Sequence, residues 1–180
     1  PLIGARRDDW QSRWLALAEL RARRAPQNAS GSGLKLIDAA ASQWRRRLRC
    51  GTPPPESVPA HALGDVLLHA FPDRIGKQHE REPLRYQLSG GRMARLHPDS
   101  TLYGEPWLCA SELKFEAKEA LILRAAPIDQ RRLEQDFPER FSTRDSVCWD
   151  ERSHALVARR ERHFDQIVLS SQTGGKVDPE

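Results

Sequence analysis

The sequence has few of the features that define secreted, membrane-spanning or metal-binding proteins. It contains three cysteines, Cys50, Cys109 and Cys148, which are far apart and form no C-x-x-C or Cys/His ligand spacing. An odd, sparse set is typical of reduced thiols, so we expect a cytoplasmic location. The sequence has no run of 18 apolar residues and no charged-then-apolar leader, so we predict neither a membrane span nor a signal sequence.

Catalytic motifs are missing too. There is no G-x-x-x-x-G-K-[ST] phosphate loop, no G-x-S-x-G elbow and no H-E-x-x-H pair. His61 and His69 are eight residues apart and could share one face of a helix, but the sequence places no third ligand beside them. We therefore predict no catalytic residue and no metal or cofactor site in this chain.

Methionine is nearly absent, and the chain begins with "PLIG". The only methionine is Met93. We therefore expect this sequence to be a piece of a longer or processed polypeptide.

Arginine dominates the basic residues that are present. There are 24 arginines and 5 lysines, and the formal net charge is +4. Guanidinium groups suit phosphate recognition, although an Arg-, Ala- and Pro-rich genome explains the same bias. The net charge is +7 over residues 1–50, +1 over 51–96 and −4 over 97–180, so any phosphate-attracting field lies in the first half.

The first part of the chain has helical periodicity. Apolar residues recur every three or four positions over 6–24, 34–49 and 59–71, which predicts three helices. A Pro-rich connector lies near 50–58, and Pro72 ends the third helix because the residue before a proline avoids the α region. We predict that residues 1–83 form a helical segment.

The period then changes to two. Strands are predicted at 84–88 and 92–96 around an "SGG" turn, followed by strands at 107–113 and 119–128 and a helix within 129–138. Two last strands are predicted around "DERS" within 145–170, and no internal repeat is found. The predicted fold is α+β: the helical segment is followed by a small OB-like antiparallel β-barrel with one inserted helix, over 84–172. A flexible tail follows at 173–180; a split α+β arrangement or another small barrel stays open.

Aromatic residues are few, and most are predicted to be core residues. Trp10, Trp14 and Trp44 lie on apolar helix faces, and Trp107 and Trp149 begin or sit in strands, so we expect all five to be packed. Tyr86 could stack a nucleic-acid base, but a core or barrel-surface position is favoured.

Basic residues form three candidate patches. The first is "WRRRLR" at 44–49. The second runs from "PDRIGK" onward and consists of Arg74, Lys77, Arg81 and Arg85. The third combines the hairpin with the last strand and consists of Arg92, Arg95, Arg159, Arg160 and Arg162. Glu161 and Asp165 interrupt that strand, so a solvated charge ladder explains it equally well. The candidate nucleic-acid-binding residues are Arg74, Lys77, Arg81, Arg85, Arg92, Arg95, Arg160 and Arg162.

The order of short motifs resembles a known family. "FPDRI", "SGGR", "GEPWL", "APID" and "ARRER" occur in the order found in the C-terminal region of HrpB-type ATP-dependent helicases, which belong to the DEAH/RHA class of superfamily 2. The resemblance covers about residues 59–171, and residues 6–49 are similar to the end of the preceding helical region. Met93 after "GGR" and the less basic "RHFDQIVL" depart from the family pattern.

The resemblance implies a function for the chain. It implies the last helices of a ratchet-like region and an OB-like domain that help to line the channel for a single strand of nucleic acid, with RNA favoured over DNA. The segment "PDRIGK" at 72–77 would lie near the exit of that nucleic-acid strand, with Arg74 and Lys77 as phosphate contacts. The chain would be a non-catalytic accessory fragment, because Walker A and DEAH motifs are absent and ATP and Mg²⁺ would bind the motor domains of the parent polypeptide.

Two other functions stay open. The mixed-charge last half suits a protein–protein interaction module that docks a regulator or partner of the helicase. The third hypothesis is a small stand-alone enzyme that uses His61, His69 or the carboxylates of 129–151.

Overall fold

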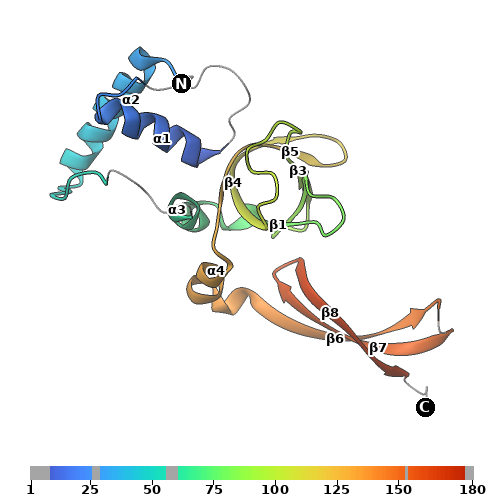
Figure 1. The fold of residues 1–180 in the computed structure, drawn as a ribbon. Coiled ribbons are helices and arrows are strands. Elements are labelled where there is room, and N and C mark those ends of the chain that lie inside the picture. Colours follow the sequence, from blue (N-terminus) through green and yellow to red (C-terminus); the bar gives the residue numbers. More distant parts are fainter. Residues whose placement is uncertain (1–8, 26–28, 56–60, 153, 177–180) are drawn as a thin grey trace.

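The structure is a computed structural model that describes residues 9–25, 29–55, 61–152 and 154–176. Figure 1 shows two helices on one side, a small barrel in the middle and a long sheet that projects away from it. The predicted α+β class, with an N-terminal helical part and an OB-like barrel, is confirmed.

The helical part contains three of the predicted helices: α1 (Trp10–Arg21), α2 (Gly31–Arg47) and α3 (Ala62–Ala70). Side-chain caps determine where the first two begin. The Asp9 carboxylate accepts hydrogen bonds from the backbone N–H groups of residues 11 and 12, and the Ser30 hydroxyl accepts one from Gly33. The predicted starts at 6 and 59 lie outside the described residues.

Five short strands close the barrel: β1 (Ile75–Gln78), β2 (Arg85–Leu88), β3 (Met93–Arg95), β4 (Trp107–Phe115) and β5 (Ala120–Pro127). Their order is β1-β2-β3-β5-β4, and β4 pairs with β1 to complete the circle. Neighbours are antiparallel except for β3 and β5, which are parallel. The barrel is filled by ten buried residues: Tyr86, Leu88, Ala94, Leu96, Leu102, Leu108, Ala110, Ala120, Ile122 and Ala125.

The barrel begins earlier than the sequence predicted. Strand β1 lies inside the segment 1–83 that was assigned to helices. It has only four residues, and Ile75 and Gly76 are both buried, so the alternation that reveals a half-exposed strand is missing. Over 75–127, which the structure describes without a gap, no helix interrupts the barrel strands; α4 (Gln130–Asp136) follows them, so the predicted inserted helix lies after the barrel.

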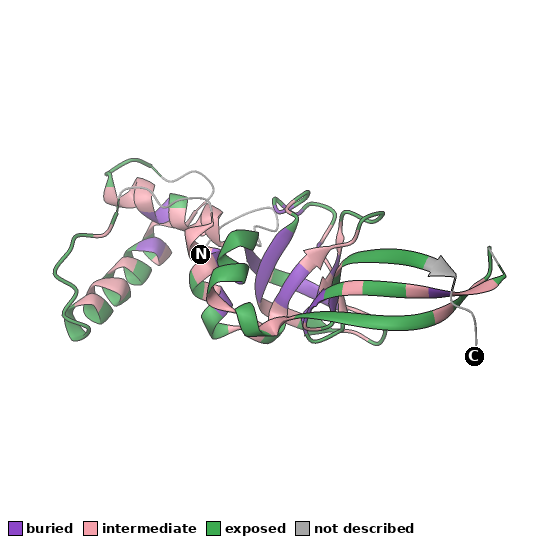
Figure 2. Cartoon of the chain, turned by 90° about the horizontal axis from the view of Figure 1, so that it is seen from below, coloured by how far each residue is buried: buried purple, intermediate pink, exposed green. Residues whose placement is uncertain are grey.

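Three later strands form a separate sheet, here called the distal sheet: β6 (Phe141–Asp150), β7 (Ala155–Phe164) and β8 (Ile167–Lys176). The sequence placed these residues in the barrel domain and predicted two strands. A reversal at Asp165, whose φ is 49°, divides the second of these into β7 and β8. Figure 2 shows that most of the distal sheet is exposed, since polar side chains occupy both of its faces.

The predicted tail also differs. Residues 173–176 belong to β8, and residues 177–180 lie outside the described residues. How the chain divides into domains remains a prediction.

Helix α3 packs closely on the barrel. A second apolar cluster joins it to β1, β4, α4 and the base of the distal sheet through Leu68, Ile75, Trp107, Cys109, Ile128, Leu133, Phe164 and Ile167. Gly64 makes this approach possible, because a Cβ there would overlap the carbonyl oxygen of Pro127 and would lie 2.6 Å from Cγ2 of Ile128. The helix needs a glycine here for space, not for an unusual backbone angle.

We predict that Gly64→Ala lowers the free energy of unfolding although alanine is the better helix former. Overlap with Pro127 forces α3 away from the barrel, and overpacking of this kind costs roughly 1–3 kcal/mol. Urea denaturation measures the change. The matched control is Gly31→Ala in α2, where an added Cβ has no neighbour within 4 Å. Equal stability of Gly64→Ala and the unmodified protein would contradict the packing described here.

Candidate nucleic-acid interface

The stretch "FPDRIGKQ" at 71–78, here called the joint, connects the helices to the barrel. The N–H of Phe71 makes the last hydrogen bond of α3, to the carbonyl oxygen of Leu67. Pro72 then begins a short 3-10 helix, η1 (Pro72–Arg74), which leads directly into β1. Proline ends α3 and presets the first turn of η1.

Arg74, the first candidate in the joint, points toward the barrel. Its Nη1 donates a hydrogen bond of 3.0 Å to the carbonyl oxygen of Ser111 in β4, and its guanidinium lies 5.0 Å from the ring centroid of Phe71. The carboxylate of Asp73 is 3.6 Å away. Through these contacts, Arg74 holds the joint against the barrel.

Cys109 lies beside the joint and is fully buried. Burial, reinforced by the charge of Asp73, raises the pKa of its thiol to about 12, while Arg74 acts in the opposite direction. The thiol is therefore neutral at physiological pH. It is a packing residue and not a nucleophile.

Lys77 connects the barrel to the distal sheet. Its Nζ donates to the carbonyl oxygens of Val168 at 3.0 Å and Leu169 at 3.2 Å, both in the edge strand β8. Gln87 adds a parallel link, from Nε2 to the carbonyl oxygen of Gln166 at 2.8 Å. Both acceptors are backbone carbonyl oxygens, so neither bond pairs Lys77 with a carboxylate.

Arg140 is the residue that the sequence reasoning missed. It ends the second 3-10 helix, η2 (Pro138–Arg140), and forms an ion pair with Asp165 at the β7–β8 turn. Its Nη2 also donates to the carbonyl oxygen of Pro72 at 2.8 Å, and its guanidinium lies 4.8 Å from the ring centroid of Phe164. Arg140 thus holds the joint and the distal sheet together.

A short repeat in the sequence could have identified Arg140. "FPDRI" at 71–75 and "FPERF" at 137–141 share a Phe-Pro-acid-Arg pattern, and both fold as a helix end, a 3-10 turn and the start of a strand. In each copy the arginine lies over the phenylalanine, at 5.0 Å for Arg74 and 5.4 Å for Arg140. The statement that the chain has no internal repeat was therefore wrong at the scale of five residues.

Three candidates lie around the hairpin of the barrel. Arg85 and Arg95 are opposite each other on β2 and β3, and both pair with Glu119, at 3.1 and 3.4 Å. Arg85 also donates a hydrogen bond to the carboxylate of Glu82, which raises the pKa of the Arg85 guanidinium. Arg92 donates to the backbone carbonyl of Glu116 and lies over the ring of Phe115.

Two candidates share one face of β7. Arg160 forms two hydrogen bonds with Asp145 on β6, of 2.7 and 3.0 Å, which lower the pKa of that carboxyl. Arg162 pairs with Glu134 of α4 at 3.3 Å. Both guanidinium groups already have a carboxylate partner.

The last candidate, Arg81, lies with Lys77 in a groove between the barrel and the edge of β8. The groove has a volume of about 330 Å³, and its lining also includes Gln78, His79, Glu80, Gln87 and residues 168–171. Within the described ranges, the Arg81 side chain makes no hydrogen bond or ion pair. Among the eight candidates, positive charge without a carboxylate partner therefore lies at Lys77, Arg81 and Arg92.

Two further hypotheses concerned a metal site at His69 and base stacking on Tyr86. His69 pairs with Asp136 at 3.2 Å and lies against Phe137, and no cluster of three or more metal-binding side chains occurs among the residues that the structure describes. Tyr86 is fully buried and donates its hydroxyl to the carbonyl oxygen of Glu105 at 2.7 Å, so its ring is unavailable to a base. Burial raises the pKa of this hydroxyl.

Two tryptophans contradict the core predictions. Trp44 in α2 and Trp149 in β6 are 59% and 55% exposed, whereas Trp107 is buried. Trp10 is partly buried and donates its Nε1–H to the hydroxyl of Ser111 at 2.8 Å, which ties α1 to the barrel. Among the described helices, none is both long and apolar enough to span a membrane.

A helical segment, a closed OB-like barrel and a projecting three-stranded sheet define the α+β architecture of the described residues. Comparison with known proteins makes the relationship specific. The family described as "ATP-dependent RNA helicase HrpB, connector region" matches residues 140–173, which begin at Arg140 and cover β6, β7 and most of β8.

Two kinds of relative agree with this match. ATP-dependent RNA helicase HrpB from Escherichia coli (strain K12) is 31% identical over 112 residues, which are 61% of this chain and 14% of that protein. A crystal structure of the E. coli DExH-box NTPase HrpB aligns with 97% of this chain and 22% of its own, with a TM-score of 0.60 and 25% identity. A second, of the E. coli DEAH/RHA helicase HrpB, aligns over the same shares with a TM-score of 0.58 and 25% identity.

The chain therefore spans less than a quarter of the length of these relatives. The predicted resemblance to the C-terminal region of HrpB-type helicases is confirmed.

We predict that Arg140→Ala destabilises the protein and releases the distal sheet from the joint. The change leaves the partly buried carboxylate of Asp165 and the carbonyl of Pro72 without their donor, at a cost of about 2 kcal/mol. Urea unfolding measures the stability, and hydrogen exchange at residues 165–169 reports the local release. The control Arg160→Ala removes an exposed pair and should leave both readings unchanged. Similar effects of the two variants would contradict this role of Arg140.

Proposed function

We propose that this chain is a C-terminal accessory part of an HrpB-type ATP-dependent RNA helicase, where it contributes to the channel for a single strand and does not itself hydrolyse ATP. One observation carries the proposal: the structural similarity to HrpB extends over 97% of the chain, through helices, barrel and distal sheet together. The description of the matching family supports RNA as the nucleic acid. A cytoplasmic location follows from the same proposal.

The motor would lie elsewhere in the parent polypeptide. The 180 residues contain no phosphate loop and no DEAH sequence, so the ATP phosphates and Mg²⁺ would be held by motor domains outside them. Those motor domains would be partners of this chain, and the nucleic acid would be shared between them.

We place the phosphate contacts of this region in the groove beside β8. Arg85, Arg95, Arg160 and Arg162 are each within 3.5 Å of a carboxylate, which reduces the attraction that they exert on a phosphate. Lys77 and Arg81 line one groove and have no carboxylate partner among the described side chains. Arg92 lies apart from them, on the hairpin.

The first test is RNA binding. We expect a labelled single-stranded RNA to bind in fluorescence anisotropy, with affinity that falls steeply from low to physiological salt. Arg81→Ala should weaken binding by roughly three- to tenfold and reduce the salt slope by about 1, as the loss of one phosphate contact does.

The matched control for this test is Arg131→Ala. Arg131 is an exposed arginine of α4, and no side-chain partner is recorded for it in the described part of the chain. The substitution removes the same charge outside the groove. Equal weakening by the two variants would show that RNA binding depends only on net charge. Absence of RNA binding at low salt would exclude the groove as an independent RNA contact.

The second test is ATP hydrolysis. We expect the purified 180-residue protein to release no phosphate from ATP above the buffer rate, with Mg²⁺ and with or without RNA, because its sequence contains neither the phosphate loop nor the DEAH motif that would hold the triphosphate and its metal. A coupled phosphate-release assay measures the rate. Release that increases in proportion to protein concentration and persists through repeated purification would contradict the accessory role.

A further inference from the structure

The last strand, β8, has an uncharged sequence that suits pairing with a further strand. Residues 167–173 read "IVLSSQT", a run without charge, proline or glycine. Short segments of this kind add to one another edge to edge when they are exposed. In the described part of the chain β8 pairs only with β7, so it forms an edge of the distal sheet, and residues 170–173 are exposed.

The opposite edge of the distal sheet, β6, is built differently. It pairs with β7 in unbroken register from Phe141 to Asp150 and carries Arg144 and Asp145 near its middle. Charged side chains on an edge strand oppose pairing with another strand. β8 has no charged residue between 167 and 173, so protection of its edge must come from its backbone or from another part of the chain.

The backbone of β8 contributes a bulge. Arg162 and His163 are neighbours on β7, whereas their partners on β8 are Ser170 and Val168, so Leu169 is an extra residue without a partner on β7. The Leu169 side chain packs against the apolar cluster at the base of the sheet. A bulge bends the strand and interrupts the regular row of N–H and C=O groups along its edge.

Lys77 acts at this bulge. Its Nζ donates to the carbonyl oxygens of Val168 and Leu169, at 3.0 and 3.2 Å, so one ammonium group occupies two acceptors and places a positive charge beside the strand. The backbone of Lys77 pairs with Gln87 on β2 and with Trp107 on β4. The closed barrel therefore holds the lysine in position beside β8.

We propose that Lys77 is the gatekeeper of the distal sheet: together with the bulge at Leu169, it prevents the segment 167–173 from pairing with the same segment of a second copy. Lysine and bulges are common protections of sheet edges. Here the lysine comes from the barrel, 91 residues before Val168 in the chain. Every group in this contact belongs to the described residues, so the protection acts in the 180-residue protein whatever the rest of a parent polypeptide covers.

This role goes beyond the proposed RNA contact and does not depend on it. An ammonium group has three N–H donors, so the two bonds to β8 leave one donor for a phosphate. Loss of RNA binding would therefore leave the gatekeeper role of Lys77 intact, and the two are tested by different measurements.

The test is Lys77→Met, which removes the charge and the donors but keeps an unbranched side chain. We expect the 180-residue variant to form dimers and larger species with increasing concentration in sedimentation-velocity ultracentrifugation, whereas the unmodified protein stays monomeric. Amide hydrogen exchange at 170–173 should slow by roughly tenfold or more in the associated variant, because N–H groups at the edge become paired.

Two variants serve as controls. Lys114, an exposed lysine of β4, pairs with Glu116, so Lys114→Met makes the same chemical change away from β8 and should leave the protein monomeric. The double variant Lys77→Met/Ser171→Lys should also be monomeric, because it places a charge inside the segment itself. Ser171 lies opposite Glu161 on β7, which gives the new lysine a carboxylate neighbour.

Several results would overturn the proposal. They are a Lys77→Met variant that stays monomeric, equal association of Lys114→Met, and association that slows exchange in β6 but not at 170–173. Circular dichroism and urea unfolding establish that each variant is folded. If Lys77→Met does not fold, Lys77→Gln removes the same charge with a smaller change in polarity, and the same expectations and the same contradicting results apply to it.

Discussion

The guanidinium group of Arg140 is the contact on which the placement of the distal sheet depends. The sheet has no apolar core of its own along most of its length, so it projects from the molecule only because its base is held firmly. Arg140 provides an ion pair to Asp165 at the β7–β8 turn and a hydrogen bond to Pro72 in the joint. One side chain thus connects the end of α3 to the beginning of the distal sheet, and its guanidinium lies against the ring of Phe164.

The same local solution is used twice. At each Phe-Pro-acid-Arg sequence, proline ends a helix, the chain turns once and a strand begins, while arginine folds back over phenylalanine. In the first copy Arg74 binds the barrel, and in the second Arg140 binds the first copy. The segments where the barrel and the distal sheet begin therefore meet at the carbonyl oxygen of Pro72. This oxygen also accepts a hydrogen bond from Ser89.

Net charge is a poor guide to how these arginines function. The chain is basic overall, but Arg85, Arg95, Arg160 and Arg162 pair with carboxylates brought near by strand register or by α4. Such partners come from distant positions in the chain, so the sequence could show the arginines without showing that they were occupied. At the end of α2 the contacts are of another kind, since Arg46 donates to the carbonyl oxygen of Ser42 and Arg47 lies over the ring of Trp44.

Periodicity predicted most of the fold, and its failures have physical causes. Strong 3.6-residue and two-residue patterns located α1, α2, α3 and the strands β2 to β5. β1 was not predicted because it is short and buried on both sides. β8 was not predicted as a separate strand because Asp165 reverses the chain without a glycine. Trp44 was predicted as core because an apolar stripe normally faces the protein; here the face toward α1 is defined instead by Leu34 and by the Arg21–Asp38 pair. Arg140 was missed because a contact among three distant segments has no period.

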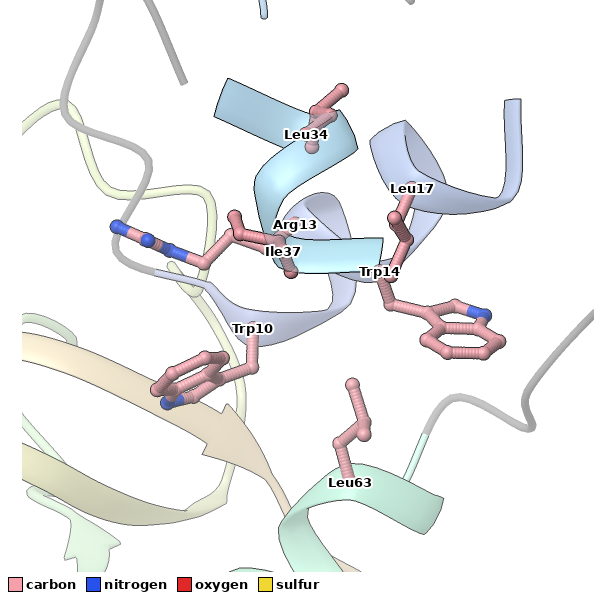
Figure 3. A pocket seen from close by; sticks show the side chains of 7 residues that line it. All are labelled: Trp10, Arg13, Trp14, Leu17, Leu34, Ile37 and Leu63. Carbon is pink, nitrogen blue, oxygen red and sulfur yellow. The ribbon is translucent and has the colours of Figure 1, made fainter. Parts of the chain in front are cut away.

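The helices and the groove are connected through one residue of the barrel. The hydroxyl of Ser111 accepts the Nε1–H of Trp10 in α1, and its backbone carbonyl accepts the Nη1–H of Arg74 in the joint. Trp10 also lines an apolar pocket among α1, α2 and α3 (Figure 3), while the joint continues through β1 to Lys77 in the groove. Since Lys77 also donates to the carbonyl oxygens of Val168 and Leu169, direct hydrogen bonds and one short strand connect α1 to the edge of the distal sheet.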